Sequence, residues 1–377
     1  MLYRNLLIFT FVTNIYSLSL PPTNGPYSVG SKPLLLEKTT QDDPVSPNGT
    51  GTSLILNVYY PTLANVSLRP YLWEGLATYY EEYYSVPSGA FRDVTARVAH
   101  AAPPLLDCAE LALPTLIWGA PFAGPPSQMF FNLFSQLVST GYTIVTIDHP
   151  GEQPYLQYPN GTGIPGLSED FIPDDKFINR VHEYRLEDNS AVLDALTNIQ
   201  ETLDIPLNLT HVALFGHSLG GSAALNQLLI ERNRSHPEIL GSVDIDGQIF
   251  PPASATDSSA DIRTPAFLLI SEQHLAIGDP TFPTFVSWQS QWVKEISVHG
   301  KTNHTDFSDL VMLLQANGIT GGDGAIKAER MVNVTRTFVG AFFDMISGKV
   351  VGESVLSGSE EVRQDWPEVG FENSVLD

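Results

Sequence analysis

The pattern of hydrophobic and polar positions changes character at about residue 114. From there, short runs of β-branched and aliphatic residues alternate with longer segments whose apolar residues recur at helical spacing. The expected strands are residues 116–118, 142–147, 212–215, 243–245, 267–271 and 293–298, and the clearest helices are residues 127–140 and 187–203. Alternating strands and helices predict an α/β fold with a mostly parallel central sheet and helices on both faces.

Two features precede this alternating region. Residues 33–37 and 53–60 are extended stretches that predict an antiparallel pair at the start of the domain. Residues 71–84 repeat aromatic and aliphatic side chains at helical spacing, and we interpret them as a helix packed on the sheet. The alternative is a flap over an acyl pocket or a face that makes weak contact with a lipid surface.

The two ends of the chain differ from its middle. Residues 1–19 carry one basic residue, Arg4, then a mostly apolar run too short to span a membrane, and small residues before Pro21. This pattern predicts a signal peptide and a secreted, extracellular protein, with an uncleaved anchor as the alternative. Residues 20–347 are expected to form the folded domain. Residues 348–377 contain seven acidic and two basic residues and are expected to form a loosely held acidic tail.

Composition narrows the possible functions. The 377 residues include 19 Lys and Arg against 42 Asp and Glu, which gives a formal charge of −23. Binding to a nucleic-acid backbone or to anionic lipid requires a basic surface, so neither is expected. The single cysteine, Cys108, excludes an intramolecular disulfide and a thiolate metal cluster. Nothing in the sequence indicates a metal, a cofactor or an obligate protein partner.

A candidate nucleophile lies between a strand and a helix. The pentapeptide Gly216-His217-Ser218-Leu219-Gly220 follows residues 212–215 and precedes a small-residue helix. In hydrolases with a G-x-S-x-G motif, the serine sits on a strained strand-to-helix turn, where neighbouring side chains must be absent. The strand before and the helix after the motif favour this interpretation over an ordinary glycine-rich turn.

A serine hydroxyl needs a base to take its proton and an acid to orient that base. In this architecture the acid and then the histidine follow the serine along the chain. Of the four later histidines, His304 is preferred because it lies in the loop beyond the last predicted strand, with His299 as the reserve. Asp246 and Glu272 each end a predicted strand, and spacing alone does not choose between them.

Several separated segments resemble the secreted, plasma-type platelet-activating-factor acetylhydrolases, also called lipoprotein-associated phospholipases A2. They are Gly25-Pro26-Tyr27-Ser28-Val29-Gly30, Asn57-Val58-Tyr59-Tyr60-Pro61, Gly216-His217-Ser218-Leu219-Gly220-Gly221, Asp246-Gly247-Gln248-Ile249-Phe250-Pro251 and His304-Thr305-Asp306-Phe307-Ser308-Asp309. The resemblance spans residues 25 to about 345. It implies an α/β-hydrolase fold and a triad of Ser218, Asp246 and His304, which demotes Glu272.

The resemblance also implies an oxyanion hole and a substrate. One donor would be the backbone N–H of Leu219. The other lies in a loop where the family's His-Gly-x-Gly is replaced, with Ala123 as the nearest positional match and Phe122 as the alternative; Pro121 has no N–H. The implied substrate is a glycerophospholipid with a short or oxidised sn-2 acyl ester, hydrolysed without calcium. The alternatives are another carboxylic ester or polyester, a feruloyl ester, or a hydrolase-like binding protein without catalysis.

Glycosylation sequons fit a secretory route. The candidates are Asn48, Asn65, Asn160, Asn208, Asn233 and Asn333. A seventh sequon, Asn303, directly precedes the candidate base His304, and a glycan there would crowd the cleft. We therefore expect Asn303 to be unoccupied, and a glycan found there by mass spectrometry would count against His304 as the base.

Overall fold

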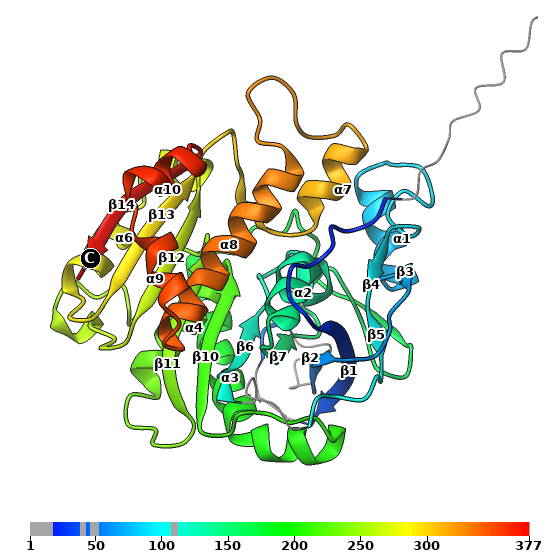
Figure 1. Ribbon diagram of the computed structural model, residues 1–377, viewed down its shortest axis with the longest axis horizontal. Coiled ribbons are helices and arrows are strands. Elements are labelled where there is room, and N and C mark those ends of the chain that lie inside the picture. The colour runs from blue at the N-terminus through cyan, green and yellow to red at the C-terminus, as the bar shows by residue number, and fades with distance from the viewer. Residues whose placement is uncertain (1–17, 38–42, 46–52, 107–111, 377) are drawn as a thin grey trace, which may run out of the picture.

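The computed structural model describes residues 18–37, 43–45, 53–106 and 112–376 (Figure 1). Its strands are β1 (Ser28–Leu36), β2 (Leu54–Thr62), β3 (Leu68–Pro70), β4 (Thr95–Arg97), β5 (Ala99–His100), β6 (Thr115–Gly119), β7 (Ile144–Asp148), β8 (Tyr155–Gln157), β9 (Gly163–Pro165), β10 (His211–His217), β11 (Glu238–Ile245), β12 (Ala266–Ser271), β13 (Val293–Val298) and β14 (Val369–Val375). Its helices are α1 (Glu74–Tyr83), η3 (Ser127–Phe130), α2 (Phe131–Ser139), α3 (Asp175–Leu203), α4 (Leu219–Ile230), η4 (Ser258–Ala260), α5 (Glu272–Ile277), α6 (Thr281–Trp288), η5 (His304–Phe307), α7 (Leu310–Ala316), α8 (Ala328–Ile346), α9 (Val350–Leu356) and α10 (Glu360–Asp365).

The main sheet has the order β14-β13-β12-β11-β10-β6-β7-β2-β1-β5. The strands from β13 to β7 in this order run parallel, and β2 and β14 are antiparallel to their neighbours. Helices α2 and α8 cover one face, whereas α3 and α4 cover the other (Figure 1). This is the α/β-hydrolase fold, so the fold class predicted from the sequence is confirmed. The predicted antiparallel pair is also present, as β1 and β2.

The core explains why the alternating pattern folds this way. Both faces of β7 and β12 are buried, and so most of their residues are apolar. On the α2 side, the ring of Trp118 lies 4.7 Å from Phe130, 5.0 Å from Phe134 and 4.9 Å from Phe215, measured between centroids. The segment of residues 71–84 forms α1, whose Leu76 and Tyr80 are buried in the same core, as a packed helix requires.

The helix expected over residues 187–203 begins earlier than its hydrophobic pattern suggested. Helix α3 starts at Asp175, and the side chain of Asp174 caps it by accepting a hydrogen bond from the N–H of Phe177 (2.8 Å). The first part of α3 is mostly exposed, so it lacks the apolar stripe that marks the second part. The segment between β7 and residue 187 therefore contains the hairpin of β8 and β9 and the first turns of α3.

The acidic segment after residue 347 is not loosely held, so this prediction is wrong for the described residues. Strand β14 pairs antiparallel with β13 from Val293↔Val375 to Val298↔Val369 and forms an edge of the main sheet. The ring of Phe371 packs 6.3 Å from Phe338 of α8. Unpaired backbone groups along β13 favour an added strand whatever its charge, which composition does not reveal.

The predicted boundary between the signal peptide and the folded domain, after residue 19, falls among the described residues. Thr95 donates its backbone N–H to the carbonyl of Leu18 (2.9 Å), and its carbonyl accepts from the N–H of Leu20 (2.9 Å), so the described residues belong to the fold from Leu18 onward. The predicted signal peptide, apart from residues 18 and 19, lies outside the described residues, as do Cys108 and Asn48. In the described part of the chain, none of the helices has the length and apolar character needed to span a bilayer.

Candidate active site

Ser218 lies on a strained turn between β10 and α4. Its φ and ψ are 57° and −128°, and its N–H donates to the carbonyl of Ile245 (2.9 Å) on the neighbouring strand. A Cβ on Gly216 would lie 2.3 Å from the carbonyl carbon of Gly220, and one on Gly220 would lie 2.2 Å from the carbonyl oxygen of Gly119. Both glycines are therefore needed for the backbone to pass so closely, as expected for a nucleophile elbow.

Asp246 follows β11 and is almost completely buried. Its Oδ2 accepts a hydrogen bond from Nδ1 of His304 (2.7 Å), and its Oδ1 accepts one from the N–H of Ser271 (2.6 Å). Burial alone would raise the pKa of Asp246, but hydrogen bonds from His274, His304 and Ser271 outweigh it and hold that pKa far below its ordinary value. Asp246 is therefore ionised whenever the protein is folded near neutral pH.

His304 begins η5, and a second histidine fixes its backbone. Nε2 of His217 donates to the carbonyl of His304 (2.8 Å), and the two ring centroids lie 4.5 Å apart. Burial, with the nearby His304, lowers the pKa of His217 to about 3, so His217 stays neutral. His217 lies inside the elbow motif, and its contact with His304 could not be read from the sequence; in the folded chain it holds the backbone of His304.

The three sequence-predicted residues meet in one pocket of about 380 Å³. Ser218, Asp246 and His304 line it together with Leu219. The remaining walls are partly apolar and partly polar, formed by Phe122, Ile178, Gln248, Phe250, Ser271, Gln273, His274 and Ile277. The pocket can therefore hold an uncharged group with an apolar arm beside a hydroxyl, an imidazole and a carboxylate.

The loop after β6 is held in place by buried polar side chains, which no motif in the sequence marks. Arg185 of α3 forms an ion pair with Glu152 and hydrogen-bonds the carbonyl of Ala120. Nε2 of Gln153 donates to the carbonyl of Pro121 (2.8 Å). The arginine, the glutamate and the glutamine are all at most 4% exposed. These contacts fix the backbone directly before Phe122.

The structure places the two candidates for the second oxyanion donor differently. Phe122 lines the pocket, whereas Ala123 is buried with a φ of 47° and is not among the described residues that line it. Phe122 also packs against Phe171 and Phe177 with centroid distances of 6.1 Å to each. Leu219, the first donor candidate, is the first residue of α4, where backbone N–H groups point outward from the helix.

The reserve candidates from the sequence lie elsewhere. Oε2 of Glu272 accepts from the N–H groups of Gly300 (2.9 Å) and Lys301 (2.6 Å), so it fixes a loop. His299 faces Glu372 at 4.0 Å, at the edge formed by β13 and β14. Asp244 is buried beneath the elbow, its Oδ1 accepts from the N–H of Gly247 (3.0 Å), and burial raises its pKa well above the ordinary value.

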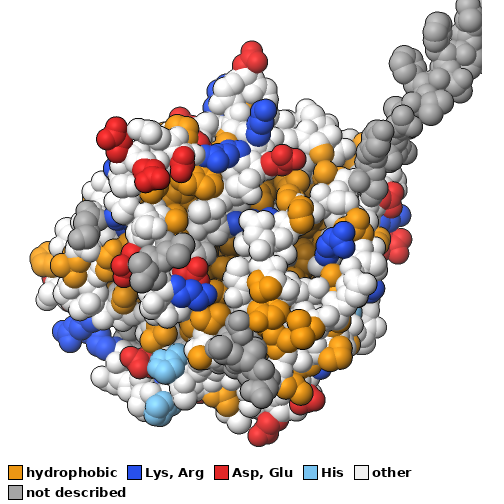
Figure 2. Space-filling model, viewed as in Figure 1, with side chains coloured by type: hydrophobic (Ala, Val, Ile, Leu, Met, Phe, Trp, Pro, Cys, Tyr) orange, Lys and Arg blue, Asp and Glu red, His pale blue; other side chains and the backbone are white. Residues whose placement is uncertain are grey.

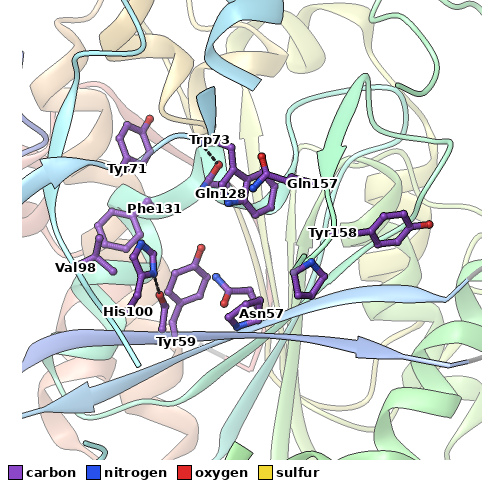
Figure 3. A pocket seen from close by; sticks show the side chains of 13 residues that line it. Asn57, Tyr59, Tyr71, Trp73, Val98, His100, Gln128, Phe131, Gln157 and Tyr158 are labelled. Carbon is purple, nitrogen blue, oxygen red and sulfur yellow. Dashed lines mark hydrogen bonds between the residues drawn. The ribbon is translucent and has the colours of Figure 1, made fainter. Parts of the chain in front are cut away.

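A second, smaller cavity of about 100 Å³ lies between β1, β2 and the start of α1 (Figure 3). Figure 3 shows the rings of Tyr59 and Phe131 beside His100, whose Nδ1 hydrogen-bonds Ser31 (2.8 Å). Ser218 is not among its described lining residues, so it is separate from the pocket above.

On the face shown in Figure 2, the Lys and Arg side chains are scattered in small separate groups. Among the described residues, no group of three or more His, Cys, Asp or Glu side chains is arranged to hold a metal ion.

The sequon residues differ in accessibility. Asn65, Asn160, Asn233 and Asn333 are exposed. Asn208 is half-buried, and its Nδ2 donates to the carbonyls of Ala112 (3.1 Å) and Leu113 (3.2 Å). Asn303 caps η5 by accepting from the N–H of Thr305 (3.0 Å). Glycosylation at any of these positions stays a prediction.

The fold and the elbow define an α/β-hydrolase chain. A search against protein-family models finds none that matches. Among curated proteins, the chain is 23% identical over 267 residues to a protein of Arthroderma benhamiae named as a probable 1-alkyl-2-acetylglycerophosphocholine esterase. The match covers 66% of this chain and 64% of that relative, a little under two thirds of its length. Among solved structures, a ferulic acid esterase from Streptomyces cinnamoneus superposes with a TM-score of 0.74 at 21% identity, covering 95% of this chain and 100% of that one.

Proposed function

We propose that this chain is a serine ester hydrolase in which Ser218 is the nucleophile, His304 the base and Asp246 the acid that orients it. The observation that carries this proposal is the 2.7 Å hydrogen bond between Nδ1 of His304 and Oδ2 of Asp246, in the pocket that Ser218 enters from its strained turn. This bond fixes the histidine tautomer that leaves Nε2 free to take a proton.

The reaction proceeds through an acyl-enzyme. His304 takes the proton of the Ser218 hydroxyl as its oxygen attacks the ester carbonyl, and the resulting imidazolium is stabilised by Asp246. The C–O bond to the alcohol then breaks, and His304 gives its proton to the leaving oxygen. Water attacks the acyl-enzyme by the same route, which releases the acid and restores Ser218.

The oxyanion is held by the backbone N–H of Leu219 and by one N–H of the loop after β6. Ala123 was the positional candidate, and the lining of the pocket favours Phe122. A donor of this kind typically contributes about 3 kcal/mol to the transition state. The contacts of Arg185 and Gln153 with the preceding carbonyls fix the loop before substrate arrives.

The proposed substrate is a glycerophospholipid with a short or oxidised sn-2 acyl chain, cleaved outside the cell after removal of the signal peptide. The motifs shared with the plasma-type acetylhydrolases and the name of the curated relative support this choice. A feruloyl or simple carboxylic ester is the second candidate, because the similar solved structure is a ferulic acid esterase and aromatic rings of Phe122 and Phe250 line the pocket. A non-catalytic binding role is disfavoured by the intact triad.

A substrate panel with calcium chelated tests this choice. We expect kcat/KM for a 2-acetyl glycerophosphocholine to exceed that for its 2-oleoyl counterpart and for methyl ferulate by at least about tenfold, since each methylene misplaced in a shaped pocket costs about 1–3 kcal/mol. p-Nitrophenyl acetate serves as the reference for general esterase activity. Preference for methyl ferulate would reject the phospholipid proposal and keep the esterase.

A further inference from the structure

Asp246 contacts a second histidine as well as His304. Nδ1 of His274, on α5, lies 3.3 Å from Oδ1 of Asp246, whereas His304 contacts the other carboxylate oxygen, Oδ2. The backbone N–H of His274 donates to Oγ of Ser271 (3.1 Å), and that hydroxyl in turn donates to Oδ2 of Asp246 (3.1 Å). The edge of the His274 ring packs against Phe282 at 4.8 Å between centroids. The second imidazole is therefore fixed in place by several contacts.

Both ring nitrogens of His274 face carboxylates. Nδ1 faces Asp246, and Nε2 lies 3.5 Å from Oδ2 of Asp279 in the turn after α5. A neutral imidazole can donate from only one nitrogen, so the other would turn a lone pair toward a negative oxygen. Only the doubly protonated ring can donate to both carboxylates. The geometry therefore favours a positive charge on His274.

The titratable groups near His274 are three carboxylates and the imidazole of His304. Asp246 follows β11, Asp279 lies between α5 and α6, and Glu295 is on β13. His304 begins η5 and lines the same pocket as His274. Burial lowers the pKa of His274, but the hydrogen bonds and charges of Asp246 and Asp279 outweigh burial and raise it above its ordinary value.

We propose that His274 is a positioning residue whose positive charge partly neutralises Asp246, so that His304 stays unprotonated to lower pH than Asp246 alone would allow. This inference rests on the proposed function. The same charge disfavours the His304 imidazolium during the reaction, which makes it a stronger acid toward the leaving alcohol. His274 lines the pocket, yet it acts here through Asp246.

The test compares His274→Asn with the unchanged protein. Asparagine keeps a donor near Asp246 and removes the charge. A unit charge about 4 Å away, screened as in bulk water, is expected to move a titration by about one pH unit. The acid limb of the kcat/KM profile for p-nitrophenyl acetate should therefore shift upward by about one unit, with about tenfold lower activity at pH values below the limb. A limb that coincides with that of the unchanged protein would overturn the inference.

A second readout does not depend on turnover. The Cε1–H resonance of His304, assigned from its disappearance in His304→Asn, should titrate about one unit higher in His274→Asn. Asp279→Asn weakens the charge on His274 and leaves Asp246 unchanged, so the His304 titration should shift upward by less than in His274→Asn. This variant replaces His274→Asn in the test if His274→Asn does not fold. His211→Asn is the matched control, because His211 faces Glu238 at the other end of β10. If the unchanged protein has no Ser218-dependent turnover, the proposed function fails, and the NMR titration still decides the role of His274.

Discussion

Replacing Ser218 with alanine is expected to lower kcat for p-nitrophenyl acetate by about 10⁴- to 10⁶-fold, because the nucleophile of a Ser-His-Asp system cannot be replaced by its partners. The stability should change little, since alanine meets no more strain than serine at a φ of 57°. Labelling by a fluorophosphonate should disappear as well, because only an activated serine hydroxyl reacts.

The control for this variant is Ser287→Ala, which removes an exposed hydroxyl on α6 that donates locally to the carbonyl of Thr284 (2.7 Å). It should retain full turnover and full labelling. A Ser218→Ala protein that still turns over the ester at the original rate would reject the serine mechanism, and with it the role of His304.

Replacing Arg185 with methionine is expected to have the largest effect on stability. The substitution leaves the carboxylate of Glu152 buried without its charged partner and the carbonyl of Ala120 without its donor. Breaking a buried ion pair in this way costs about 3–5 kcal/mol, which urea unfolding would measure. The loop before Phe122 also loses its anchor, so kcat should fall by about 10²-fold if an oxyanion donor is displaced.

A double variant separates the two effects. In Arg185→Met with Glu152→Leu, no unpaired charge is left, so most of the stability should return while kcat stays low. Arg180→Met, on the exposed part of the same helix, breaks the solvent-exposed pair with Glu183 and should change neither property. Recovery of kcat together with stability in the double variant would show that Arg185 does not hold the oxyanion loop.

Much of the fold was predictable because its signals are local. Strands buried on both faces are mostly apolar, and this holds for β6, β7 and β12. Boundaries were less certain. The first turns of α3 are polar and exposed, so only a capping residue, Asp174, marks where the helix begins. Strand β14 is also largely polar, and its place in the sheet depends on the open edge of β13.

The candidate site likewise has one part that local sequence predicts and one part that only the folded chain shows. The elbow around Ser218 could be predicted because Gly216 and Gly220 lie close together in the sequence. A side chain at either position would collide with the backbone of the turn. The choice between Asp246 and Glu272 was not decided by spacing, since both end a strand. The folded chain directs Glu272 to the backbone of Gly300 and Lys301, and Asp246 to His304.

The sequence by itself determined the α/β class and the strained serine turn that carries the candidate nucleophile, because periodicity and glycine spacing act over a few neighbouring residues. Only the tertiary structure decided which groups surround that chemistry. His274 reaches Asp246 across 28 residues, His217 reaches His304 across 87, and Arg185 reaches Ala120 across 65. Such contacts follow from how strands order themselves in the sheet, and no short pattern encodes that order.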